Sequence, residues 1–98
     1  MAYITCNGMI EAQKISSHLL KKRLIACANI FPVKSMYWWD NKIAEENEIV
    51  IFTKTNEKNF NNVAKEIKKI HSYKIPCIMR IEAKTNKEFE LWANKEMK

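Results

Sequence analysis

Residues 35–55, SMYWWDNKIAEENEIVIFTKT, decide the fold of this 98-residue chain. Three aromatic residues lead into Asp40-Asn41, and Asn tolerates the positive φ angle that a two-residue hairpin turn requires. The residues on both sides of this turn are suited to extended strands. The stretch is therefore predicted to form two long strands that fold back on each other as one hairpin.

The second arm of this hairpin, residues 48–53, is apolar on both faces. Alternate residues of a strand point to opposite faces, so Ile49 and Ile51 share one face while Val50 and Phe52 share the other. The helices of so short a chain can cover one face of a small sheet, and the second face then needs another copy of the protein. We therefore expect self-association. The residues predicted at the interface are Tyr37, Trp38, Trp39, Ile49 and Ile51.

Length and composition indicate one domain, residues 1–98, with a modest core of its own. The chain has one Gly and two Pro, so most of it is expected to be regular helix or strand. No apolar run approaches the roughly 20 residues that a membrane-spanning helix needs. The first residues, MAYITCNG, lack the pattern of a secretory signal. A cytoplasmic location and no membrane partner are the resulting expectations.

The net charge of +6 comes from 17 basic and 11 acidic residues. Such a balance is compatible with an acidic partner such as nucleic acid. However, 15 of the 17 cations are Lys, spread over helix faces, and no dense Arg-rich patch of the kind that grips phosphates is present. We therefore predict no nucleic-acid partner.

The remaining periodicity predicts the other elements in order. Residues 3–6 form a short strand, residues 10–23 a helix, and residues 24–31 a strand that bulges or bends at Pro32 before entering the hairpin. After a cap at residues 55–57, a second helix buries one face. That face comprises Phe60, Val63, Ala64, Ile67 and Ile70. Residues 77–83 form a fourth strand, and a capping box at residues 85–88 starts a last helix that buries Phe89, Trp92 and Ala93.

This order predicts an α+β fold of the ferredoxin-like βαββαβ type, an antiparallel sheet with a long hairpin between its second and third strands and a terminal helix. Two helices on one face leave the other face bare. In the expected strand order 4-1-3-2, the end of the first strand lies beside the start of the fourth.

Four motifs occur in order along the chain: Arg23-Leu24-Ile25-Ala26-Cys27-Ala28-Asn29-Ile30; Ser35, Tyr37, Trp39 and Lys42; Glu45 and Glu48 before Lys54-Thr55; and His71, Tyr73 and Pro76, with Trp92 in the last helix. Together they resemble the CutA family of divalent-cation tolerance proteins over essentially the whole chain. The chain departs from the family pattern at Asn41, Ser72 and Cys77, where Gly, Pro and Glu are usual.

The resemblance implies a cytosolic homotrimer whose hairpins reach across to neighbouring subunits, similar in architecture to PII-type signalling proteins. It also implies a role in tolerance of divalent metals, copper especially, through metal binding or regulation. A PII-like module that binds a small anionic ligand in clefts between subunits is the alternative.

The strand order suggests candidate metal ligands. Cys6 and Cys77 are expected on neighbouring strands, with His71 in the loop that leads into the fourth strand, and two thiols with an imidazole suit copper(I) or another thiophilic ion. The resemblance adds Cys27, which lies about 10 Å or two strand spacings from Cys6. The competing interpretation is that the cysteines are buried, reduced apolar side chains and that His71 bonds to the backbone.

Other functions have less support in the sequence. No motif for enzymatic chemistry is visible, so a binding or regulatory protein is predicted rather than an enzyme. The ferredoxin-like sheet is also an RNA-binding platform, but the Lys/Arg-Gly-aromatic signature of those modules is absent, and only Tyr3 and Phe52 fall on the central strands. A closed trimer would also bury that face.

Overall fold

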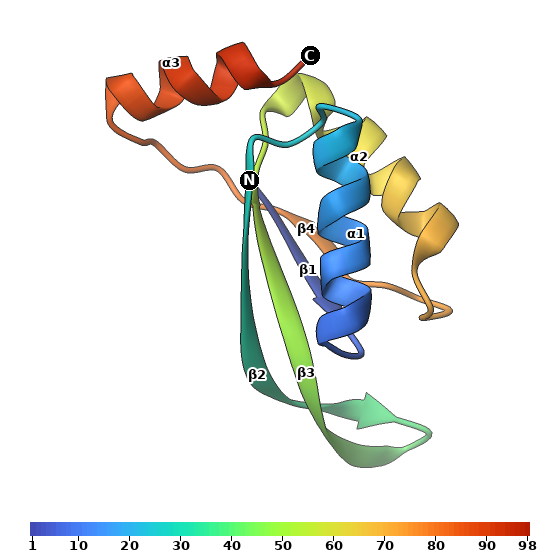
Figure 1. Ribbon diagram of the computed structural model, residues 1–98. Helices are drawn as coiled ribbons and strands as arrows, with labels where there is room; N and C mark the ends of the chain where they lie inside the picture. Colours follow the sequence, from blue (N-terminus) through green and yellow to red (C-terminus); the bar gives the residue numbers. More distant parts are fainter.

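The computed structural model describes residues 1–98 as three helices and a four-stranded antiparallel sheet (Figure 1). The elements are β1 (Ala2–Cys6), α1 (Met9–Lys21), β2 (Cys27–Trp39), β3 (Lys42–Lys54), α2 (Glu57–Ile70), β4 (Ile78–Arg80) and α3 (Lys87–Glu96). The strand order is β2-β3-β1-β4 and every neighbouring pair is antiparallel. This confirms the predicted ferredoxin-like α+β class and its strand order.

The hairpin of β2 and β3 protrudes far beyond the helices (Figure 1). Its strands pair without interruption from Cys27 with Lys54 to Trp39 with Lys42. Asp40 and Asn41 have φ angles of 55° and 62°, as a two-residue turn of this twist requires. The outer part of the hairpin, residues 33–47, is called the arm below.

Of the bulge or bend expected at Pro32, the bulge is absent, because Pro32 pairs one to one with Ile49. β2 is an edge strand, and an edge strand tolerates a residue that has no N–H to donate. The hairpin does bend between the sheet and its tip (Figure 1).

The core lies between α1, α2 and one face of the sheet. Buried core residues are Ala2, Ile4, Cys6, Ala12, Ile15, Leu19, Ile25, Ile51, Val63 and Ile67. Ile51 has no exposed surface, and Ile49 packs against the same cluster. The pairing of Ile51 with Ile4 explains this, because cross-strand partners share a face. Ile49 and Ile51 therefore belong to the chain's own core and do not form a free apolar face, contrary to the prediction that placed them at an interface.

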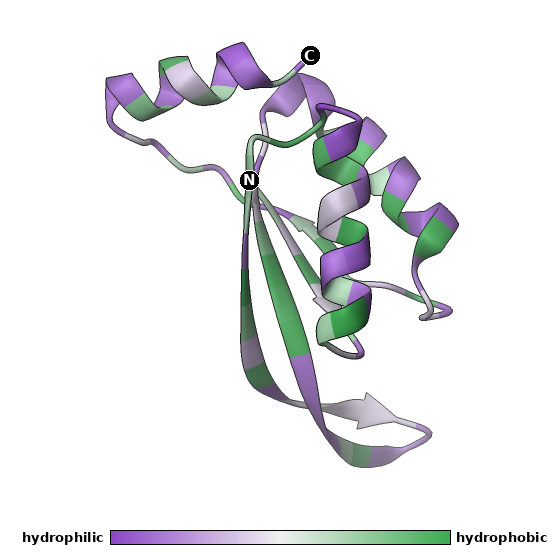
Figure 2. Cartoon of the chain, in the orientation of Figure 1, coloured by the Kyte–Doolittle hydropathy of each residue, from purple (hydrophilic) through white to green (hydrophobic).

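The opposite face of the sheet has no helix over it and is rich in apolar side chains. Phe52 contacts the ring of Tyr3 edge-on, with centroids 5.7 Å apart, and stacks with Phe31 at 6.4 Å. Phe31 and Met79 remain 38% and 49% exposed. Figure 2 shows that the hydrophobic run of β3 lies in the body of the sheet and that a polar run follows toward the arm. We call this helix-free side the uncovered face.

Several element ends differ from the sequence prediction. α1 ends at Lys21, and Arg23 adopts a left-handed φ of 60°, which stops the helix two residues before the expected end. β2 begins at Cys27 rather than at residue 24, and β4 has only three residues. At α2 the expected cap is confirmed, since the side chain of Asn56 accepts a hydrogen bond from the Asn59 N–H at 2.8 Å.

α3 stands apart from the body, at the end of the molecule opposite the hairpin tip (Figure 1). The capping box expected at its start is absent, because Asn86 is the N-cap and Thr85 donates its hydroxyl to the Asn86 carbonyl. Trp92 is 45% exposed and Ala93 is buried. The expected burial of Trp92 is therefore wrong within one chain. None of the three helices combines the length and the apolar composition needed to cross a bilayer.

A buried carboxylate ties α1 to α2. Glu66 of α2 accepts a hydrogen bond from Lys69 at 2.8 Å, and it contacts His18 of α1 at 2.9 Å and Lys22, the residue after α1, at 3.4 Å. The hydrogen bonds from Lys69 and then His18 lower the pKa of Glu66 to about 2, against a smaller opposing effect of burial.

Glu66 should make folding sensitive to acid. Its pKa is lower in the folded state than the ordinary value of 4.5, so its stabilising contribution is complete above about pH 4.5 and is lost as the pH falls toward 2. We expect Glu66→Gln to flatten the decline in unfolding free energy between pH 5 and pH 3, as measured by urea denaturation. The matched control, Glu88→Gln on exposed α3 surface, should keep the wild-type slope. Equal slopes in both variants would contradict the assignment.

A second prediction concerns the core. Ile51→Ala should lower the free energy of unfolding by about 3 kcal/mol, because it empties a fully enclosed site. Ile10→Ala, at a residue that is 86% exposed on α1, should change it by less than about 0.5 kcal/mol. Urea denaturation measures both. A small effect at Ile51 would argue against its place in the core.

Candidate functional site

The loop of residues 71–77, between α2 and β4, holds two of the predicted metal ligands. His71 is fixed by two backbone groups: its Nδ1 accepts a hydrogen bond from the Tyr73 N–H at 3.0 Å, and its Nε2 lies 2.9 Å from the Thr5 carbonyl. A carbonyl oxygen only accepts, so Nε2 carries the ring proton and donates it. Both ring nitrogens of His71 are therefore hydrogen-bonded to backbone groups. This agrees with the alternative prediction that His71 bonds to the backbone rather than to a metal.

The two cysteines near this loop do not converge. Cys6 is buried in the core, and its thiol contacts the Gly8 carbonyl at 3.7 Å. Burial, with a smaller contribution from Glu11, raises the pKa of the Cys6 thiol to about 11, so it stays protonated. Cys77 is exposed and precedes Ile78, which pairs with Ile4 on the helix side. Cys77 is therefore open to solvent just before β4, whereas Cys6 is enclosed in the core.

Cys27 is also remote from this loop. It begins β2 opposite Lys54, and β3 separates β2 from β1. No group of three or more His, Cys, Asp or Glu side chains in the chain is arranged to hold a metal ion. The four predicted ligands, Cys6, Cys27, His71 and Cys77, are thus not brought together within one chain.

Two carboxylates hold the loop in place: Glu11, which the sequence analysis did not single out, and Glu48, which it named only as part of the family motif. Glu11 accepts hydrogen bonds from the backbone N–H groups of Ser72 and Asn7 at 2.8 and 3.1 Å. Burial acts to raise the pKa of Glu11, but these bonds outweigh it and the pKa lies below its ordinary value. Nothing local in the sequence marks Glu11, because Ser72 is 61 residues away.

Glu48 is the second of these carboxylates. It is buried and accepts a hydrogen bond from the Tyr73 hydroxyl at 2.6 Å. Burial first, and then this bond, raises the pKa of Tyr73, so its hydroxyl remains a neutral donor. The loop is therefore held to β1, α1 and β3 by separate hydrogen bonds, and Cys77 is its last residue.

Two exposed sulfur side chains lie at the end of this loop and on β4. Cys77 is the last residue of the loop, and Met79 of β4 pairs with Tyr3 on the uncovered face. A thiolate and a thioether are soft ligands. One chain supplies only this pair, which is fewer ligands than a stable metal site uses.

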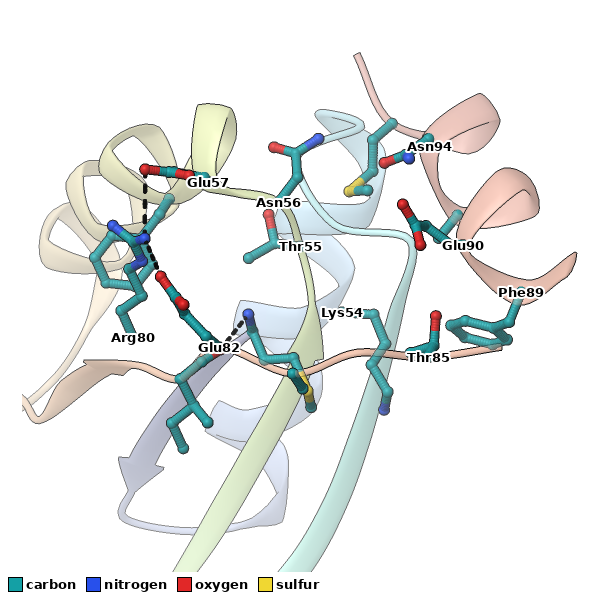
Figure 3. A pocket seen from close by; sticks show the side chains of 16 residues that line it. Lys54, Thr55, Asn56, Glu57, Arg80, Glu82, Thr85, Phe89, Glu90 and Asn94 are labelled. Atoms are coloured by element: carbon teal, nitrogen blue, oxygen red, sulfur yellow. Dashed lines mark hydrogen bonds and ion pairs between the residues drawn. The ribbon is translucent and has the colours of Figure 1, made fainter. Parts of the chain in front are cut away.

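A cavity of about 390 Å³ lies between α3, the start of α2 and the segment that follows β4 (Figure 3). On one side Arg80 pairs with Glu57 at 3.4 Å and with Glu82 at 2.8 Å. On the other side α3 contributes Phe89, Glu90 and Asn94 (Figure 3). Its volume is within the range of small-molecule sites. Sequence reasoning did not locate this cavity, because its existence depends on how far α3 stands from the sheet.

The terminal amine of Met1 lines the same cavity. It donates a hydrogen bond to the Ile81 carbonyl at 2.7 Å, and the Ile81 N–H donates in turn to the Met1 carbonyl at 2.8 Å. Burial, followed by the positive charge of Arg80, lowers the pKa of this amine. The charged groups on this side of the cavity thus already have partners.

The fold and site define a class of small α+β proteins: a ferredoxin-like sheet with one uncovered face, a protruding hairpin and a rigid loop that presents ligands. The CutA1 divalent ion tolerance protein family matches residues 1–96. The chain belongs to this family.

Individual relatives agree with this assignment. The divalent-cation tolerance protein CutA of Archaeoglobus fulgidus is 44% identical over 91 residues, which cover 92% of this chain and 89% of that protein. Its solved structure, described as periplasmic, has a TM-score of 0.95 at 42% identity and covers 97% of this chain and 94% of that one. A variant of CutA1 from Pyrococcus horikoshii has a TM-score of 0.96 at 37% identity, with coverages of 99% and 96%.

A more distant neighbour relates the fold to signalling proteins. The PII-like protein CutA from Nostoc superposes with a TM-score of 0.91, covering 99% of this chain and 95% of that one. At 22% identity, this likeness concerns the fold alone.

The geometry predicts how the thiols react. A water-soluble aromatic disulfide at pH 8 should modify Cys6 only after the protein unfolds, because Cys6 is buried and its pKa is raised to about 11. Mass spectrometry of peptides identifies the modified residue. The Cys6→Ser variant should lack the thiol that denaturant uncovers. Modification of Cys6 in native buffer as fast as in denaturant would contradict its place in the core.

Proposed function

We propose that this protein acts in divalent-cation tolerance as a homotrimer that binds copper through ligands from more than one copy. The observation that carries the proposal is a pair of exposed soft donors close in sequence: Cys77 just before β4, and Met79 on the apolar uncovered face that a partner is expected to cover. Membership of the CutA1 family supports the tolerance function. Copper(I) is the ion that thiolate and thioether ligands favour.

The apolar surface supports assembly. Trp38 and Trp39 on the arm are 72% and 61% exposed, and Phe31 and Met79 are exposed on the uncovered face. Aromatic residues and Met are enriched at interfaces between proteins. Tyr37, Trp38 and Trp39 therefore remain the proposed contacts of the arm, and Phe31, Phe52 and Met79 replace Ile49 and Ile51 as the proposed contacts of the sheet.

A ligand-sensing role is the second candidate. In this case the protein is a PII-like module that binds a small anionic ligand and signals to a partner. The cavity lined by Arg80 and Lys54 supports it by its size, which is that of a small-molecule site, although an anionic ligand would have to displace Glu57 or Glu82 from Arg80. We propose binding or regulation rather than catalysis, since both nitrogens of His71 are committed to backbone groups.

A cytoplasmic location is also part of the proposal. All three cysteines are free, including exposed Cys77, which is the state that a reducing compartment maintains.

One set of variants tests the metal proposal. Light scattering should give three times the mass of one chain at micromolar concentration. Titration with copper(I) against a chromophoric competitor should show tight binding that Cys77→Ser weakens at least tenfold. Cys27→Ser is the control and should bind as the wild type does, because Cys27 lies at the far side of the sheet.

Two results would count against the proposal: a folded single chain in solution, or unchanged copper affinity in Cys77→Ser. A thermal shift with nucleotides or carboxylates but not with copper would favour the sensing role instead.

A further inference from the structure

The net charge of the chain is concentrated in one layer of the fold. The two helices α1 and α2, with the turns that follow them as far as Arg23 and Lys74, contain nine basic and three acidic residues. The rest of the chain contains eight of each. The helix layer therefore carries all of the net charge of +6, while the sheet, the arm and α3 together are neutral.

Lysines occupy the outward positions of both helices. α1 buries Ala12, Ile15 and Leu19, and by helical spacing Lys14 and Lys21 lie on the opposite side. On α2, Lys65 and Lys68 lie opposite the buried face in the same way. These four side chains belong to exposed residues. Lys14 and Lys21 are seven residues apart, or about 10.5 Å along the helix, which is about three phosphate steps along one strand of duplex DNA.

The three acidic residues of this layer do little to neutralise the positive charge of its outer surface. Glu66 is buried beneath Lys22 and Lys69, and Glu11 is engaged by backbone N–H groups of Asn7 and Ser72. Glu57 pairs with Arg80 at the edge of the layer. The outward surface thus carries cations whose negative partners are turned inward or away.

The side-chain types indicate which polyanion fits. The only Arg here, Arg23, is paired with Glu96 at 2.9 Å, and no aromatic residue lies on α1. Protein interfaces depend on aromatic and Arg anchors, base recognition in RNA depends on stacking aromatics, and membrane-surface helices use a broad apolar face. α1 does expose Met9, Ile10 and Leu20, but these lie at the two ends of the helix and do not form a broad apolar face. Lysine ammonium groups on such a surface suit the phosphate backbone of a duplex, which is contacted without reading sequence.

We propose that the outer surface of α1 and α2 binds the phosphate backbone of double-stranded nucleic acid independently of its sequence. The proposal goes beyond a role in metal tolerance and reverses the expectation drawn from composition. In the sequence the lysines look dispersed, but folding gathers nine of the cationic residues on one layer. In a trimer with its sheets turned inward, three such layers would face outward.

Two variants with equal net charge test this. The layer variant carries Lys14→Gln, Lys21→Gln, Lys65→Gln and Lys68→Gln. The control variant carries Lys34→Gln, Lys42→Gln, Lys84→Gln and Lys87→Gln, which lie outside the layer. Fluorescence anisotropy with a 30-base-pair DNA duplex, at several salt concentrations from 50 to 200 mM, gives the affinity and its salt dependence. Circular dichroism checks that both variants fold, which is expected because Gln is a good helix former.

We expect the wild type to bind two unrelated duplexes equally, with an affinity that falls as salt rises. The layer variant should lose at least tenfold in affinity at 50 mM salt, and the slope of log K against log salt should shrink by about 3 to 4, because each phosphate contact contributes about 0.9. The control variant should keep the wild-type slope. Equal losses in both variants would show an effect of bulk charge alone and overturn the proposal. So would binding to phosphatidylserine vesicles without binding to the duplex, or no binding at 50 mM salt.

Discussion

The antiparallel pairing of β1 with β3 is the constraint on which the rest of the molecule depends. It places Ile4 beside Ile51 and Tyr3 beside Phe52, and so determines which side chains enter the core. A slip of one residue would exchange the two faces of β3, because side chains alternate along a strand. The same pairing sets the position of Thr5, whose carbonyl holds His71, and of Glu48, which holds Tyr73.

Much of the fold could be predicted because its signals are local. The turn at Asp40-Asn41, the spacing of Val63 and Ile67 on α2, and the order of strands and helices are all legible in short windows of sequence. Short windows of sequence did not show which face of β3 packs against the helices. Both faces are apolar, so alternation alone does not say which one meets the helices. α3 was misjudged in part: its apolar residues look like one buried stripe, but only Ala93 is buried and Trp92 remains 45% exposed.

The site was less predictable than the fold because it depends on contacts distant in sequence. The prediction put Cys6 and Cys77 on neighbouring strands, but Cys77 ends the loop before β4 and is exposed, whereas Cys6 on β1 is buried in the core. Glu11 and Glu48 give no sequence signal of their role, since their partners lie in the loop before β4. The distribution of charge was hidden similarly, because residues from two distant helices form one layer.

The arm has a consequence for how the protein is held together. A ribbon of two strands with no helix over it is barely stable in water, whereas the body of the sheet has a core of its own. The order of the arm then depends on what docks against it, and its folding free energy includes a term set by protein concentration. In the proposed assembly, dilution would therefore fray the ribbon first and leave an intact body, so that local order near the tip reports on subunit association.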